Sequence, residues 1–249
     1  MDNTLAIGLS RQMVLERQLD VVANNLANVD TAGYKSQGMR FERYLASGGR
    51  GIPASAEGRQ PLSYVTDPGD FLDFSEGAIE NTHDPLDVAL DGEGFLVVQT
   101  PEGERYTRDG ALKLDAAGRL VTASGDPVLG ANGPVTFSQS ETDIAIGADG
   151  TISSSQGLKD RLRLVRFADP QKLSREGGNL YAASDPPDPI EPGKLRVVSG
   201  ALERSNVQPI TATTRLIEIS RAYQLVANAI QSTSSLRETA IQQLADVAA

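Results

Sequence analysis

The sequence predicts an α+β fold. Long N- and C-terminal helices pack as a coiled-coil-like assembly domain, and the middle of the chain forms a mostly antiparallel β domain. Apolar residues at both ends recur every three or four positions, as on one face of a helix. The middle consists of short β-rich runs separated by turn signals. We therefore expect a helical assembly domain from residues 1–30 and 209–249, connecting segments at residues 31–83 and 185–208, and a β-rich domain at residues 84–184.

The N-terminal helix is predicted from about residue 3 to residue 28, a stretch that contains no proline and one glycine. Its apolar stripe has spacings of four, three, four and three residues and consists of Leu15, Leu19, Val22, Leu26 and Val29. This is the spacing of a heptad repeat. The same stripe is also typical of the core-facing side of an ordinary surface helix, so the pattern by itself leaves both interpretations open.

Three asparagines occupy the end of this helix, in the stretch ANNLANVDTAGYK: Asn24, Asn25 and Asn28. Asparagine is a poor helix former because its side chain competes for nearby backbone groups. In one hypothesis the amides fix the register of packed helices, since an unpaired buried amide costs roughly 1–3 kcal/mol. In the other they cap the helix end and form an Asx-type exit. We expect Gly33 to supply a positive φ in the turn that follows.

The C-terminal helix is predicted from about residue 210 to residue 246, with Pro209 well placed at its start. Its stripe alternates spacings of three and four residues and consists of Leu216, Ile219, Tyr223, Val226, Ile230 and Thr233. Long helices are marginal in water without packing partners. We therefore predict that these stripes form an assembly interface, either with each other or with other subunits. The residues assigned to that interface are Leu15, Leu19, Val22, Asn24, Asn25, Leu26, Asn28, Leu216, Ile219, Tyr223, Val226 and Ile230.

The segments between the helices divide into strands and connections. Residues 94–130, 143–155, 162–167 and 178–184 read as short strands and hairpins. The Gly/Ala/Ser-rich stretch at residues 46–58 is expected to be a flexible loop. The four prolines within residues 184–193 predict an extended, stiff connection.

No catalytic, metal or cofactor site is predicted, and no small-molecule substrate. The net charge of −10 argues against nucleic acid, whose phosphates need a basic face. There is no cysteine, and the single histidine, His83, has only nearby acids and no second ligand cluster. The chain is therefore expected not to be an enzyme. The alternative from another class is a secreted β-rich enzyme or binding module whose helical ends serve oligomerisation.

The sequence also bears on membranes and secretion. Its first residues have an acid where a signal peptide carries Lys or Arg, and they lack a long apolar run. No apolar run approaches the ~18 residues of a membrane span. We therefore expect no cleaved signal peptide and no direct membrane insertion.

Three motifs resemble those of the flagellar rod, hook and hook-associated axial proteins. The first is ANNLANVDTAGYK, and the second is the strand-rich stretch at residues 84–130. The third lies within residues 202–231, where Ser205-Asn206-Val207 precedes the last helix and Arg221-Ala222-Tyr223 lies inside it. Length and N-terminal sequence most resemble the proximal-rod members of this family. One departure is THDPLD, where relatives more often carry Gly-Asn before Pro-Leu-Asp.

The resemblance implies a structural subunit of the bacterial flagellar basal body. Its terminal helices would assemble with copies of itself and with other rod proteins into a drive shaft that transmits torque. It also implies delivery by the flagellar type III export apparatus and a location in the rod where it crosses the periplasm. A distal-rod or hook-type subunit is the alternative within the family.

Overall fold

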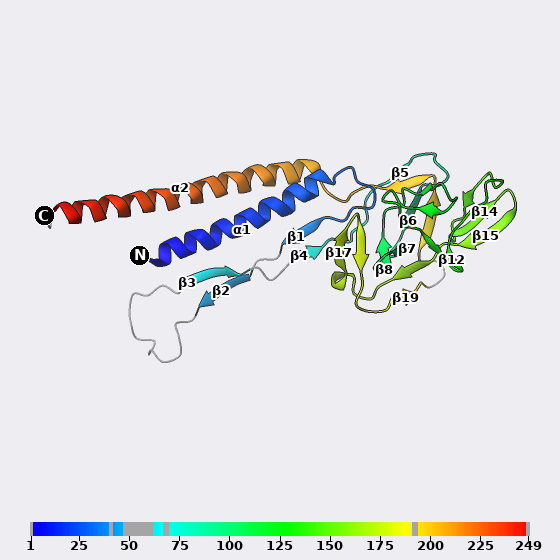
Figure 1. Cartoon of the computed structure of the whole chain (residues 1–249), viewed down its shortest axis with the longest axis horizontal. Helices are drawn as coiled ribbons and strands as arrows, with labels where there is room; N and C mark the ends of the chain where they lie inside the picture. The colour runs from blue at the N-terminus through cyan, green and yellow to red at the C-terminus, as the bar shows by residue number, and fades with distance from the viewer. Residues whose placement is uncertain (1, 40–41, 47–61, 67–69, 191–193, 248–249) are drawn as a thin grey trace. The chain divides into compact units, whose positions relative to one another are not determined.

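A computed structural model of the chain describes residues 2–39, 42–46, 62–66, 70–190 and 194–247 (Figure 1). The chain divides into two compact units. Unit 1 comprises residues 1–27, 37–71 and 208–249, and unit 2 comprises residues 28–36 and 72–207. Residues 185–207, expected as a separate connection, therefore belong to the β-rich unit. Most of the glycine-rich loop expected at residues 46–58 lies outside the described residues.

Unit 1 is built around two long helices, α1 (Asp2–Ala27) and α2 (Pro209–Val247). Its strands are β1 (Gln37–Met39), β2 (Glu42–Ala46), β3 (Leu62–Thr66) and all but the last residue of β4 (Asp70–Leu72). β2 pairs with β3 in an antiparallel ladder, and β1 pairs with β4. The two helices lie side by side (Figure 1). Gln12 contacts Tyr223 and Gly8 faces Ile230, so the helices run antiparallel.

The prediction that the helices pack as a coiled coil is wrong. Among the residues that the structure describes, buried packing between them is confined to one cluster, whose buried residues are Leu15, Val22 and Ile219. Toward the N-terminus of α1, Gln12 and Gly8 occupy the stripe positions, and neither can supply the apolar knob of a heptad seam. The heptad spacing therefore marks the side on which the helices touch and does not extend into a continuous seam over the described residues.

Unit 2 is a mostly antiparallel β structure. Its largest sheet has six strands in the order β17 (Ser174–Gly177), β18 (Leu180–Ala182), β8 (Gly103–Thr107), β7 (Phe95–Thr100), β16 (Leu164–Arg166) and β19 (Asp188–Pro189). A three-stranded sheet contains β13 (Ala145–Ile146), β14 (Thr151–Ser154) and β15 (Gly157–Arg161). A short 3-10 helix at Pro170–Lys172 precedes β17.

Four two-stranded ladders complete unit 2. They pair β9 (Lys113–Leu114) with β10 (Leu120–Val121), β11 (Leu129–Gly130) with β12 (Gly133–Pro134), β6 (Val88–Asp91) with β20 (Arg196–Ser199), and β5 (Ile79–Asn81) with β21 (Ala201–Glu203). The last two ladders join segments more than 100 residues apart in the sequence, so the return segment expected as a connection is part of the β structure.

Strand β7 is buried on both faces. Successive side chains of a strand point to opposite sides of a sheet. Leu96 and Val98 accordingly belong to one hydrophobic core, whereas Phe95 and Val97 belong to another. The second core contains edge-to-face contacts of Phe95 with Phe74 and Phe167. The continuous apolar run of this strand thus reflects a sheet between two cores.

Candidate assembly interface

The stripe residues predicted as an assembly interface pack against each other within one chain. Leu15, Val22 and Ile219 are each no more than 9% exposed. Four further stripe residues pack against this cluster and are partly buried: Leu19, Leu216, Tyr223 and Val226. Leu26 and Ile230 are half-buried. The assembly role of these residues stays a prediction, because within the chain their side chains already have apolar partners.

The close approach of the two helices also uses polar and small residues. The Gln12 side chain donates a hydrogen bond to the Tyr223 hydroxyl over 2.9 Å. A Cβ atom at Gly8 would lie 3.1 Å from the Ile230 side chain, so glycine allows this contact. Gln12 therefore interrupts the apolar stripe but satisfies the tyrosine hydroxyl where it meets α1.

Other apolar side chains of the two helices point away from this cluster into solvent. The fractional exposure is 55% for Leu9 and 63% for Met13 on α1. On α2 it is 83% for Ile210, 70% for Leu225 and 71% for Leu236. Ile217 is exposed as well, at 48%. Each helix therefore carries apolar side chains on a second face, which the heptad stripe does not include.

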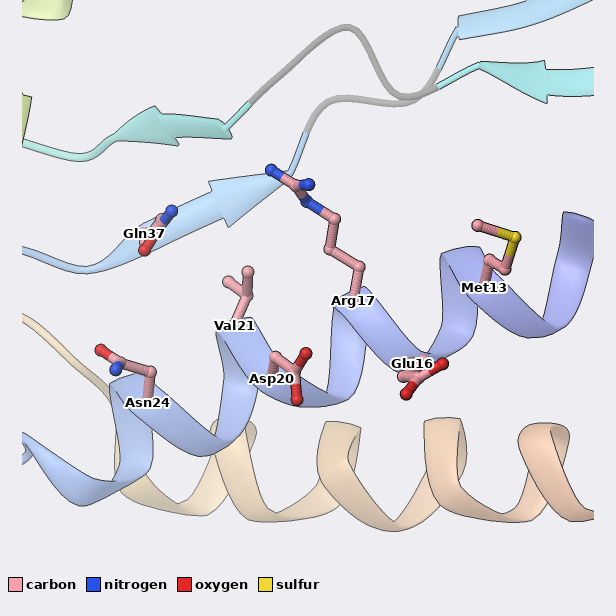
Figure 2. A pocket seen from close by; sticks show the side chains of 7 residues that line it. All are labelled: Met13, Glu16, Arg17, Asp20, Val21, Asn24 and Gln37. Carbon is pink, nitrogen blue, oxygen red and sulfur yellow. The ribbon is translucent and has the colours of Figure 1, made fainter.

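A groove of about 430 Å³ runs along the outer side of α1 beside β1 (Figure 2). Its lining residues are Met13, Glu16, Arg17, Asp20, Val21, Asn24 and Gln37. Arg17 extends toward the strand that carries Gln37, whereas Glu16 and Asp20 do not (Figure 2). The groove therefore combines apolar surface from Met13 with two carboxylates one helical turn apart.

Asn25 binds the backbone of a strand. Its amide nitrogen donates to the Gln37 carbonyl over 2.7 Å, and its amide oxygen accepts from the Gln37 amide over 2.9 Å. The side chain thus imitates the backbone of a neighbouring strand and ties α1 to β1. A register role for Asn25 between helices loses its physical basis, because the amide is satisfied within the chain.

The other two asparagines differ from Asn25. Asn28 accepts hydrogen bonds in the exit turn, at its side chain from the Thr31 hydroxyl and at its carbonyl from the Thr31 amide. This agrees with the capping hypothesis for that residue. Asn24 lines the groove and is exposed.

The residues after this turn dock onto the β structure of unit 2. Gly33 has a φ of +64°, and a side chain there would overlap the backbone of Arg108. Its amide donates to the Glu203 carbonyl over 2.7 Å. The Arg175 guanidinium stacks on the Tyr34 ring, with its central carbon 4.3 Å from the ring centroid. The motif GYK, which consists of Gly33, Tyr34 and Lys35, therefore packs inside unit 2 of the same chain.

Lys35 closes a buried ionic cluster with Glu203 and Arg108. The Lys35 ammonium lies 2.6 Å from one Glu203 carboxylate oxygen, and the Arg108 guanidinium lies 3.1 Å from the other. The three side chains are 0%, 1% and 4% exposed, respectively. Burial lowers the pKa of Lys35 and outweighs the opposing attraction of Glu203. Such a cluster is stable only when every member is paired.

Asn206, in the segment that precedes α2, forms hydrogen bonds with the segment that contains Tyr34 and Ser36. Its side-chain oxygen accepts from the Ser36 amide over 2.7 Å, and its nitrogen donates to the Asp73 carbonyl over 2.8 Å. Its own amide donates to the Tyr34 carbonyl. The segment that follows α1 and the segment that precedes α2 are thus hydrogen bonded to each other within unit 2.

Neither a metal-binding cluster nor a membrane-spanning helix is found in the part of the chain that the structure describes. No group of three His, Asp or Glu side chains is arranged to hold a metal ion there. Neither of the long helices is apolar enough over its described length to cross a membrane.

Comparison of the sequence with known proteins points to flagellar rod proteins. The flagellar basal-body rod protein FlgF of Caulobacter vibrioides is 38% identical over 250 residues, which cover 99% of this chain and 100% of that protein. The chain belongs to the flagellar basal-body rod protein family. FlgF of Mesorhizobium japonicum is 30% identical, with 98% of each chain covered. The rod protein FlgG of Bacillus subtilis is 31% identical over 89% of this chain and 91% of its own.

Three family models match successive parts of this rod protein. Residues 5–35 match the flagella basal body rod protein model, which spans most of α1 and the docked GYK motif. Residues 89–154 match the FlgE/F/G D1 domain model of the flagellar hook protein. Residues 198–243 match the C-terminal model of the basal body rod FlgEFG proteins, which spans β21 and most of α2.

These comparisons confirm the predicted resemblance and its functional meaning. The chain is a FlgF-like structural subunit of the flagellar basal-body rod, and its place is the basal body. As a member of this family it assembles with other flagellar rod proteins.

Proposed function

We propose that this rod subunit assembles through the outer faces of its terminal helices, both with copies of itself and with other rod proteins. The observation that carries the proposal is the apolar surface exposed on α2, where Ile210, Leu225 and Leu236 are each at least 70% exposed. Exposed apolar side chains gathered on one element favour burial against a partner. Burial of one leucine contributes about 1.5–3 kcal/mol, so a few such residues per subunit give a stable contact.

Membership of the rod family supports the rest of the proposed function. The subunit has no catalytic activity, lies in the proximal part of the rod where the rod crosses the periplasm, and transmits torque as part of a drive shaft. It reaches that position through the flagellar type III export apparatus. The buried ionic cluster of unit 2 supports a load-bearing role, because it ties the two chain segments next to the helices to one β structure.

The test compares two leucine-to-lysine variants in flagellated cells that lack their own copy of this chain. Leu225→Lys places a charge on the outer face of α2. Leu158→Lys is the matched control, because Leu158 is 79% exposed but lies on β15. The amount of each variant in isolated basal bodies is measured by immunoblot, and swimming is recorded.

We expect Leu225→Lys to be depleted from basal bodies and Leu158→Lys to be incorporated normally. Purified variants must show the same helix content by circular dichroism, which ensures that only the surface has changed. Normal incorporation of both variants would contradict assembly through the outer face of α2.

A further inference from the structure

The hairpin that joins β11 to β12 contains the dipeptide Asn132-Gly133. No other asparagine of the chain is followed by glycine. Gly130 pairs with Gly133 across the hairpin, so Ala131 and Asn132 form its tip. Both tip residues are exposed. The Asn-Gly pair therefore lies in a solvent-exposed turn, which is the position that this pair favours.

Gly133 leaves its own backbone nitrogen open to reaction. It has a φ of +118°, and a Cβ atom built there would meet no atom of the described residues within 4 Å. A side chain at this position would shield the nitrogen, whereas glycine has none. A bond from this nitrogen to the side-chain carbonyl carbon of Asn132 closes a succinimide ring. The nucleophile and its target are therefore adjacent in the chain, and both are accessible to water.

We propose that Asn132 is a site of spontaneous deamidation, in which the Gly133 nitrogen displaces the side-chain nitrogen of Asn132. The bond between the Gly133 nitrogen and the Asn132 Cγ forms, and the bond between Cγ and Nδ2 breaks. The Gly133 amide proton leaves with Nδ2 as ammonia. Water then opens the ring, at Cγ to give aspartate or at the main-chain carbonyl to give isoaspartate. Nothing is oxidised or reduced, and water is the only co-reactant.

Asp160 on β15 holds the nitrogen that has to leave. Its Oδ1 accepts a hydrogen bond from the Asn132 side-chain nitrogen over 3.1 Å, and its Oδ2 accepts from the Asn132 backbone amide over 3.4 Å. These bonds restrain the side chain, so they slow ring closure and do not promote it. They also connect the hairpin to the sheet of β13, β14 and β15.

The product of the reaction breaks this connection. A carboxylate at position 132 cannot donate a hydrogen bond to Asp160, and the two carry the same charge. Isoaspartate also lengthens the backbone of the tip by one methylene group. The neighbouring bond from the Ala131 amide to the Arg161 carbonyl, 2.8 Å long, is therefore weakened in modified molecules. This inference is independent of the proposed function, because it concerns unit 2 and neither terminal helix.

The test follows deamidation in the folded full-length chain during incubation at pH 9 and at pH 6. Ring closure requires a deprotonated backbone nitrogen, so the reaction is faster at the higher pH. Trypsin digestion and fragment-ion masses locate the replacement of NH2 by OH. Isoaspartate is counted with an isoaspartyl methyltransferase and a labelled methyl donor. Asn81 is the internal control, since it is exposed in the same unit but precedes Thr82, whose branched side chain shields the nitrogen.

We expect Asn132 to deamidate about tenfold faster than Asn81, because glycine leaves the following nitrogen accessible and threonine does not. Asp160→Ala should speed the reaction about threefold, which corresponds to the loss of one modest hydrogen bond. Asn132→Gln keeps an amide but needs a larger ring, so the change in mass should disappear. Circular dichroism checks that each variant is folded. If Asp160→Ala does not fold, Asp160→Asn takes its place, since it removes the charge and keeps the shape.

The structural consequence is measured with Asn132→Asp, which has the aspartate product at this position. Hydrogen exchange of the Ala131 amide should be faster in this variant than in the natural chain. Adding Asp160→Asn should restore slow exchange, because the new amide can donate to the new carboxylate.

Three results would overturn the inference. Equal rates at Asn132 and Asn81 in the folded chain would remove the site. A rate that the change at Asp160 does not raise would remove the restraining role of that carboxylate. Exchange at Ala131 that ignores the charge at position 132 would show that the hairpin tip does not respond to the modification.

Discussion

Replacing Glu203 with glutamine tests the buried ionic cluster of unit 2. The carboxylate accepts hydrogen bonds from Lys35 over 2.6 Å, from Arg108 over 3.1 Å and from the Gly77 amide over 2.9 Å. Glutamine has nearly the same shape but no charge, so the two buried cations would lose the anion that they share. Leaving a buried charge uncompensated costs about 3–5 kcal/mol. We therefore expect Glu203→Gln to lower the free energy of unfolding by about 3–5 kcal/mol.

The assay is urea unfolding at pH 7, followed by circular dichroism because the chain has no tryptophan. Arg204→Gln is the matched control. Arg204 is half exposed and pairs with Glu80 over 3.0 Å and with Asp30 over 3.2 Å. Exposed pairs contribute about 0–1 kcal/mol, so the control should change little. A loss below about 1 kcal/mol for Glu203→Gln would refute the reasoning.

The pH dependence of this loss provides a second check. Burial already lowers the pKa of Lys35, and Glu203 opposes that effect. Without Glu203 the pKa falls further, and the folded protein then binds the proton less tightly than the unfolded chain. Between the lowered pKa and the usual value for lysine, stability must therefore rise with pH. The deficit of Glu203→Gln should shrink as the pH is raised toward 10, and a constant deficit would point to packing alone.

Three further outcomes are expected. His83 has a φ of +65°, which asparagine tolerates better, so His83→Asn should raise the free energy of unfolding by about 0.5–1 kcal/mol in urea unfolding; a decrease would contradict this. Asn25→Leu removes both hydrogen bonds to the Gln37 backbone, so it should cost about 1–3 kcal/mol and speed hydrogen exchange of the Gln37 amide, whereas unchanged exchange would count against the contact. Hydrogen bonds from Thr151 hold the pKa of Asp149 at about 2, so its contribution to stability is present above pH 4 and is lost as the pH falls toward 2. A carboxyl NMR titration near 4 would show that these bonds do not form in solution.

The two faces of α2 bear on how a subunit can fold before it assembles. One face buries Ile219 against α1 within the chain, while the opposite face leaves Leu225 exposed. An isolated subunit can therefore keep its helices paired and still offer apolar surface to a neighbour. A subunit with these two faces needs no continuous heptad seam between α1 and α2.

Much of the local structure follows from the sequence by itself. Apolar spacing at the ends predicts both helices, because side chains three and four residues apart share a helix face. Turn residues and β-rich runs predict the strands in the middle, and the ANNLANVDTAGYK motif identifies the family. These features depend on neighbours a few residues apart, so the order of residues alone is enough to determine them.

Only the tertiary structure decided which distant residues meet. Lys35 and Glu203 are separated by 168 positions, and no periodicity links them, yet folding of the β structure brings them within 2.6 Å. In the same way, the binding of Asn25 to Gln37 depends on where β1 lies against α1. The heptad stripe suggested a coiled coil, but the packing of whole helices determined how far the contact extends. Long-range contacts are set by the summed packing of many elements, which the local pattern of residues does not encode.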